Sequence, residues 1–263
     1  MYMTKRDGSF ASPPRLREYG RGGLFGLLTP QGNPTAEPEI RILLPPASAL
    51  LAARLTSSSP LLRQRLSDYA ERLDEQIDRF EDIRFDAVGF ACTGASYWID
   101  PQDEQRHADA IAARKGYPMV TAAQAVKAAF EVLGVGTIAL VSPYPEWLTE
   151  ACCRHWERQG MQVSALLQLQ AGHGEAHGIY GLTTQRVLDA IASFDAGAAE
   201  VILLTGTGMP SLRAILRLER ERAMPVLSSN LCLAWALARI TGEVGPGAES
   251  RLYGGWAERL AVS

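Results

Sequence analysis

Two short segments of this sequence occur twice. Residues Gly26–Gln31 match Ala139–Tyr144, and Val88–Gly94 match Ile202–Gly208, at nearly the same spacing along the chain. Each copy is an apolar run that enters a turn rich in Gly, Pro and Thr, a pattern typical of a strand followed by a loop. The repeat predicts two similar half-domains, each of which brings two strand-end loops to one shared cleft.

Apolar runs alternate with amphipathic stretches along the rest of the chain. After a first strand that ends near Thr29, the pattern predicts strands over residues 85–91, 118–120, 137–141, 163–169, 201–204 and 225–227, and helices over 59–83, 103–115, 121–133, 147–156, 184–194, 211–222 and 230–240. Strands that are apolar throughout and separated by helices indicate parallel sheets with both faces covered. We therefore expect an α/β fold of two pseudo-symmetric Rossmann-like half-domains. The active site should lie in the cleft between them, beyond the carboxyl ends of the strands.

The repeat also suggests how the chain divides. Residues 1–22 are rich in Arg, Pro, Ser and Gly and show no periodicity, so we expect an N-terminal arm there. Residues 23–133 together with 226–263 are predicted to form the first half-domain. Residues 134–225 are predicted to form the second.

Composition narrows the class of partner. A net charge of −3 with both signs interspersed gives no broad basic surface, so we expect a small-molecule ligand rather than nucleic acid. The N-terminus lacks the apolar core of a signal peptide, and no apolar run approaches the roughly 20 residues of a spanning helix. We expect no membrane association and a cytoplasmic location. The four cysteines have neither the spacing of a disulfide framework nor that of metal ligands, so reduced thiols and no metal are expected.

Cys92 is the candidate catalytic residue. It ends a predicted strand and is followed by small residues, Thr93 to Ser96, whose amides can stabilise a carboxylate or the thiolate. A buried thiol that only fills space is the alternative. The equivalent position in the second copy is Gly206, so chemistry would be delivered from one side of the cleft. Cys152 and Cys232 lie on apolar helix faces and are expected in the core.

Two further features invite a functional interpretation. Tyr144 follows Pro143 in the second copy of the repeat, where its phenol either donates to a carboxylate or packs against the other half. His173 and His177 suggest metal binding, but three nearby glycines favour a loop beside the cleft. The sequence has no dinucleotide fingerprint, phosphate-binding loop or Gly-x-Ser-x-Gly elbow, so no cofactor is expected.

On these motifs the chain resembles the branch of the aspartate/glutamate racemase superfamily that contains maleate cis-trans isomerases and arylmalonate decarboxylases. The segments that carry the resemblance are residues 29–39, 90–96, 141–144, 203–208 and 225–230. The resemblance implies that Cys92 is catalytic. It implies substrate-binding roles for Pro30, Gln31, Asn33, Thr93, Gly94, Tyr144, Gly206, Thr207 and Gly208. Relatives of this kind also suggest a homo-oligomer, although the sequence has no coiled-coil seam.

A cysteine in only one of the two matched loops bears on three hypotheses for the function. The isomerases and racemases use two cysteines on opposite faces of the substrate, whereas arylmalonate decarboxylase has one cysteine and one glycine, exchanged between the halves relative to this chain. The leading hypothesis is decarboxylation of a substituted malonate, with Cys92 protonating one face of the carbon. Maleate isomerisation with Cys92 as the nucleophile is the alternative. A non-catalytic protein that binds a carboxylic or dicarboxylic acid is the third.

Overall fold

The chain folds around two four-stranded parallel sheets. The computed structural model describes residues 17–170, 178–242 and 244–262. The first sheet has the order β2-β1-β3-β4 and the second the order β6-β5-β7-β8. The strands are β1 (Leu24–Pro30), β2 (Ala49–Leu55), β3 (Ala87–Phe90), β4 (Met119–Thr121), β5 (Thr137–Ser142), β6 (Gln162–Gln168), β7 (Val201–Leu204) and β8 (Val226–Ser228). The two orders are equivalent, which confirms the pseudo-symmetric α/β fold.

The repeated segments form the central strand pair of each half. In the first sheet Gly26 of β1 lies opposite Val88 of β3, and in the second Ala139 of β5 lies opposite Ile202 of β7. All residues of these four strands are buried except the first of β5. Parallel strands that are covered on both faces are apolar along their whole length, and this pattern is why the sequence predicted these strands.

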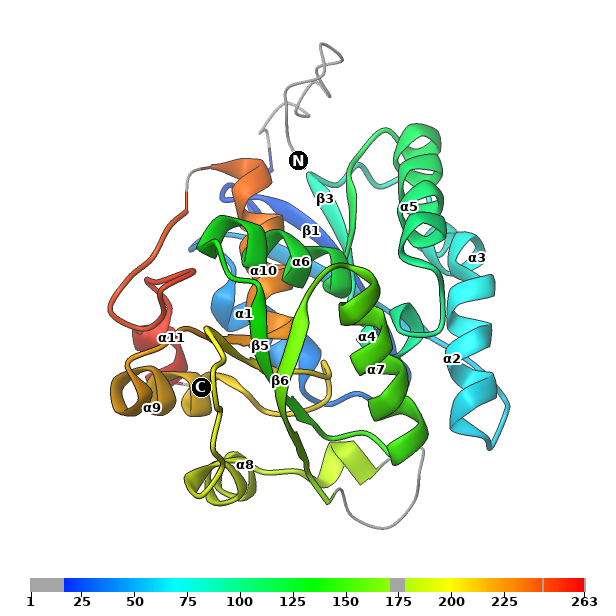
Figure 1. The fold of residues 1–263 in the computed structure, drawn as a ribbon. Helices are drawn as coiled ribbons and strands as arrows, with labels where there is room; N and C mark the ends of the chain where they lie inside the picture. Colours follow the sequence, from blue (N-terminus) through cyan, green and yellow to red (C-terminus); the bar gives the residue numbers. More distant parts are fainter. Residues whose placement is uncertain (1–16, 171–177, 243, 263) are drawn as a thin grey trace.

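Helices cover the faces of both sheets (Figure 1). They are α1 (Ala36–Leu43), α2 (Leu62–Glu71), α3 (Leu73–Asp78), α4 (Thr93–Ser96), α5 (Pro101–Lys115), α6 (Ala122–Leu133), α7 (Glu146–Arg158), α8 (Thr184–Ala192), α9 (Leu212–Arg222), α10 (Ser229–Thr241), α11 (Ala257–Ala261) and the 3₁₀ helix η1 (Gly178–Gly181). None of the helices in the described part of the chain is long and apolar enough to cross a membrane.

The chain returns to the first half through α10. Strand β8 still pairs with β7 in the second sheet, and α10 begins at the next residue and packs against α6, α1 and β3 (Figure 1, orange helix). The crossing therefore lies at Ser229, slightly beyond the predicted boundary after residue 225. Of the predicted N-terminal arm, the described part begins at Arg17, whose Nη2 donates to the carbonyl of Arg84 in the first half at 2.7 Å.

The structure differs from the sequence-based prediction in residues 36–83. The helix predicted over 59–83 is two helices, α2 and α3, because the backbone leaves the helical region at Arg72. Helix α1 and strand β2 were not predicted. By contrast, α6 has the predicted ends: Thr121 forms a capping box with Gln124, and Gly134 closes the helix with a φ of 68°.

Candidate active site

A cavity of about 550 Å³ opens where the strand-end loops of the two halves meet. Its walls include eight of the predicted site residues: Pro30, Asn33, Cys92, Thr93, Gly94, Tyr144, Thr207 and Gly208. These residues come from loops far apart in the sequence, and the repeat brings them together because each follows a central strand. We call this the central cavity.

Cys92 reaches the central cavity from the end of β3. It precedes α4, a single helical turn of small buried residues, and only 4% of its surface is exposed. Burial raises the pKa of its thiol to about 12; the amide of Ala95 lowers it in part, and the nearby Glu104 carboxyl raises it. The thiol is therefore neutral near pH 7. Cys152 and Cys232 are fully buried as predicted, and Cys153 is half-buried; among described cysteines only Cys92 lines the cavity.

A pair of hydroxyl groups joins the two halves beside Cys92. Thr93 Oγ1 and Tyr144 Oη share a hydrogen bond of 2.9 Å. Burial raises the pKa of Tyr144 well above its usual value, so the phenol keeps its proton. Tyr144 also has a side-chain hydrogen bond with Thr205, so the hydroxyl groups at this point form a small buried network.

Asn33 presents its amide nitrogen to the same region. Its Oδ1 accepts hydrogen bonds from the N–H groups of Thr35 and Ala36 at the start of α1, at 2.9 and 3.0 Å. Its Nδ2 donates to Thr207 Oγ1 at 3.2 Å. Because the oxygen is occupied by the helix start, the amide orientation is fixed with Nδ2 toward Thr207, which also lines the cavity.

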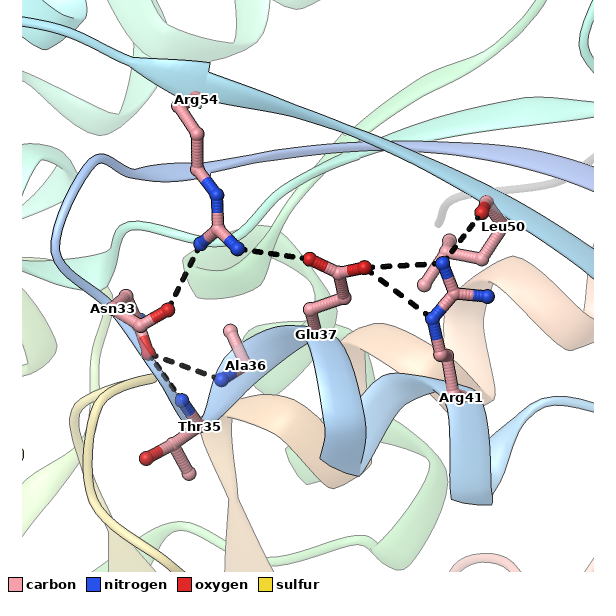
Figure 2. A network of polar contacts seen from close by, with 7 residues as sticks. All are labelled: Asn33, Thr35, Ala36, Glu37, Arg41, Leu50 and Arg54. Carbon is pink, nitrogen blue, oxygen red and sulfur yellow. Dashed lines mark hydrogen bonds and ion pairs between the residues drawn. The ribbon is translucent and has the colours of Figure 1, made fainter.

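An ion-pair network holds the backbone of Asn33 from the other side (Figure 2). Arg54 donates to the carbonyl of Asn33 and to the Glu37 carboxylate, each at 2.9 Å. Glu37 also accepts from Arg41, which in turn donates to the carbonyl of Leu50 at 3.0 Å. The turn that carries Asn33 is thereby tied to both α1 and β2.

The second-half loop is tied to the first half by further hydrogen bonds. Thr207 Oγ1 donates to the carbonyl of Ala91, next to Cys92, at 2.9 Å, and Thr35 Oγ1 donates to the carbonyl of Gly208 at 3.0 Å. Asn230 Nδ2 donates to the carbonyl of Thr207 at 3.1 Å. The loop that faces Cys92 is therefore positioned by contacts from the opposite half.

Two predicted site residues lie outside the cavity wall. The exposed Gln31 uses its Oε1 to accept from the Ser57 N–H at 2.7 Å. Gly206 itself does not line the cavity, but a Cβ built on it would come within 3.0 Å of Pro143 Cγ, 3.1 Å of Ile179 Cδ1 and 3.2 Å of Tyr144 Oη, which all belong to the cavity wall. Its φ of +94° also disfavours any side chain there. Neither Gln31 nor Gly206 lines the cavity, and the substrate contacts predicted for them stay predictions.

One helix in the cavity wall was missed as a site element. Leu62, Arg65, Leu66 and Tyr69 of α2 face the central cavity, and Tyr180 of η1 lines it as well. These α2 positions are spaced three and four apart, which the sequence showed as an amphipathic face. The spacing identifies a buried face, but not whether a core or a cavity lies against it.

The charge distribution of the site is simple. The described residues that line the cavity include one arginine, Arg65, and no aspartate or glutamate. Over the described ranges, no group of three or more His, Cys, Asp or Glu side chains could hold a metal ion. His173 and His177, for which we expected a loop near the cleft, lie outside the described residues.

Comparison with known proteins gives consistent matches. The family model described as arylmalonate decarboxylase matches residues 25–253. A maleate isomerase from Pseudomonas putida is 26% identical over 246 residues, covering 88% of this chain and 98% of that protein. A mutant of the Nocardia farcinica maleate cis-trans isomerase with a covalently bound succinylcysteine intermediate superposes with a TM-score of 0.72 at 24% identity, covering 82% and 91% of the two chains. The crystal structure of an arylmalonate decarboxylase gives a TM-score of 0.73 at 20% identity, covering 88% and 98%.

Proposed function

The chain belongs to the arylmalonate decarboxylase family, and from that premise we propose that it is a cofactor-independent enzyme acting at the carbon next to a carboxylate. The finer proposal is decarboxylation of a substituted malonate. The observation that carries it is the state of Cys92: a lone cavity thiol whose pKa burial raises to about 12 is a proton donor and a poor thiolate nucleophile.

The retained carboxylate of the substrate would bind the neutral donors of the cavity. The Thr93–Tyr144 hydroxyl pair and the amide nitrogen of Asn33 are buried and fixed by their other hydrogen bonds. Donors held in place in this way stabilise an enediolate as negative charge moves onto the carboxylate oxygens. The backbone groups of Gly94 and Gly208 are proposed to complete this site.

The departing carboxylate would lie against the apolar part of the wall, formed by Leu62, Leu66, Leu148, Leu169 and Ile179. Poor solvation there favours loss of carbon dioxide. The pair of electrons of the broken carbon–carbon bond passes into the enediolate, and the Cys92 Sγ–H proton then bonds to the carbon. A proton from water restores the thiol. Protonation comes from one face, so we expect one enantiomer.

Isomerisation of maleate is the second candidate. The loop around Asn33 and the curated relative named maleate isomerase favour it. That reaction needs a thiolate to add to the double bond, and a pKa of about 12 leaves very little thiolate near pH 7. The cavity is also of a size that suits ligands larger than a four-carbon diacid. Both points favour the decarboxylase.

Proton NMR in D2O tests the proposal. Wild-type protein, Cys92→Ser and the control Cys153→Ser are each given phenylmalonate, methyl(phenyl)malonate and maleate. We expect deuterium at the α-carbon of phenylacetate, reduced about 10²- to 10⁴-fold in Cys92→Ser and retained in Cys153→Ser, since Cys153 lies outside the cavity. Fumarate formed from maleate would support the isomerase instead. Binding without turnover of any of the three would leave the acid-binding hypothesis.

A further inference from the structure

Tyr97 is a buried tyrosine behind the wall of the central cavity. It follows α4, the helical turn after Cys92, and is 5% exposed without lining the cavity. Its hydroxyl shares a hydrogen bond with Thr205 Oγ1, which directly follows β7 in the other half. Thr205 in turn has a side-chain hydrogen bond with Tyr144. The Tyr97 hydroxyl is therefore one residue removed from the phenol that we propose to bind the substrate carboxylate.

Four hydroxyl groups form a chain that alternates between the halves. Thr93 and Tyr97 follow β3 of the first sheet, whereas Tyr144 and Thr205 follow β5 and β7 of the second. The chain starts at Thr93 Oγ1, passes through Tyr144 and Thr205 to Tyr97, and ends at the Cys152 thiol, which has hydrogen bonds with Thr205 and Tyr97. Burial raises the pKa of Tyr97 well above its usual value, so its phenol stays neutral. In such a chain each hydroxyl limits the direction in which its neighbour can donate.

The backbone holds both ends of the link between Tyr97 and Thr205. The Tyr97 N–H donates to the carbonyl of Thr93 at 3.1 Å, and the Thr205 N–H donates to the carbonyl of Val141 in β5 at 3.1 Å. The rings of Tyr97 and Tyr144 also pack edge to face, with centroids 6.1 Å apart. A hydroxyl that is held in this way keeps the Tyr144 phenol in one place before a ligand arrives.

Resting on the proposed function, we propose that Tyr97 is a positioning residue of the carboxylate site. Its hydroxyl holds the Thr205 hydroxyl, and Thr205 directs the Tyr144 phenol toward the retained carboxylate of the substrate. A donor that is aimed before charge develops on the carboxylate lowers the barrier, because it needs no reorganisation at the moment of reaction. The Tyr97 hydroxyl therefore affects the reaction although it does not contact the substrate.

Removal of single hydroxyl groups tests this role. We expect Tyr97→Phe to lower kcat/KM for phenylmalonate about tenfold, mostly through kcat, because the donor interacts more strongly with the enediolate than with the bound carboxylate. Thr205→Val removes the next hydroxyl at nearly equal size and should give a similar loss. Thr205→Ser keeps that hydroxyl and should retain most of the activity.

Tyr117→Phe is the matched control. Tyr117 is also buried and packs edge to face against an aromatic ring, that of Phe85, but it does not line the cavity. Its hydroxyl has no hydrogen-bond partner among the described residues. We expect kcat/KM of this variant to stay within about twofold of the wild-type value.

The Tyr144→Phe background separates positioning from packing. If Tyr97 acts through Tyr144, Tyr97→Phe should have little further effect on kcat/KM once the Tyr144 hydroxyl is gone. A general effect on packing would persist in that background. An equal loss in both backgrounds, or no loss in the otherwise wild-type protein, would overturn the proposal.

A binding measurement separates failure of this proposal from failure of the proposed reaction. Dissociation constants of phenylacetate are measured by calorimetry for the same proteins, and they decide the matter if phenylmalonate does not react. Weaker binding in Tyr97→Phe, absent in the Tyr144→Phe background and in Tyr117→Phe, would support the positioning role without any turnover. Equal affinity in wild type and Tyr97→Phe, or no binding to either, would then overturn it.

Discussion

Glu39 is expected to be the side chain whose charge matters most for stability. Its carboxylate is buried between the halves and accepts from the N–H groups of Ser211 and Leu212 at 2.6 and 3.1 Å, at the start of α9. It also accepts from Ser211 Oγ at 2.7 Å and Asn230 Nδ2 at 2.8 Å. Burial raises the pKa of Glu39, and these hydrogen bonds lower it in part.

The cost of Glu39→Gln can be worked out from these contacts. The amide oxygen can keep the two backbone donors, but the new NH2 group would face the NH2 group of Asn230. One buried donor would then lack an acceptor, at about 1–3 kcal/mol, and two bonds would lose their charge assistance. The relief of burying a charge offsets part of this. We expect a net loss of roughly 3 kcal/mol, or a Tm lower by about 6–12 °C for a chain of this size.

Glu37→Gln is the matched control, because Glu37 lies in the same first turn of α1 and shares any interaction with the helix dipole. Its ion pairs with Arg41 and Arg54 are half-exposed, so we expect a loss below about 1 kcal/mol. Urea unfolding of both variants measures the difference. If Glu39→Gln costs no more than Glu37→Gln, the claim that a buried carboxylate holds the halves together is refuted.

Three further predictions concern the site and its surroundings. Burial raises the pKa of Glu104 to about 7, so the folded state holds the proton of this carboxyl more tightly than the unfolded state does. The resulting stability, roughly 3 kcal/mol, is present below about pH 4.5 and lost as the pH rises through about 7. Urea midpoints at pH 5 and pH 8 should show this change in wild type and not in Glu104→Gln. The same variant removes a charge that raises the pKa of Cys92, so iodoacetamide should alkylate Cys92 faster at pH 9, as followed by peptide mass spectrometry; an unchanged rate would contradict the coupling. Gly206→Ala should cost about 1–3 kcal/mol of unfolding free energy because of the φ of +94° at this position and the close contacts of the new Cβ. Gly136→Ala is the control and should change the unfolding free energy by less than about 1 kcal/mol. A Cβ built on Gly136 has one neighbour within 4 Å, Glu200 Oε2 at 3.9 Å.

The central strands of both sheets were predictable because strands that are buried on both faces are apolar along their whole length. Strand β2 was not, since it lies at the sheet edge, is mostly half-exposed, and has a Leu- and Ala-rich sequence that is equally compatible with a helix. Its strand conformation comes from pairing with β1 along all seven residues. Such a tertiary contact overrides local preference and leaves no mark in the sequence.

The site was predictable where it follows a central strand. Cys92, Thr93, Tyr144 and Thr207 line the central cavity because parallel strands end at one edge of each sheet. Side-chain direction within a turn was not predictable, and Gln31 is the example: its amide is used by the neighbouring Ser57. Arg65 was missed for a different reason, since a helical stripe does not reveal what it packs against.

The difference between the two matched loops lies in the backbone as well as in one side chain. Cys92 has a φ of −146° and leads directly into the turn of α4, whereas Gly206 has a φ of +94°. A side chain at 206 would meet the hydroxyl of Tyr144, which is held by Thr93. A side chain added at 206 would therefore crowd the hydroxyl pair proposed to bind the carboxylate. With glycine at 206 and a thiol only at Cys92, the proposed proton transfer comes from one face, which is a structural reason to expect a product of a single handedness.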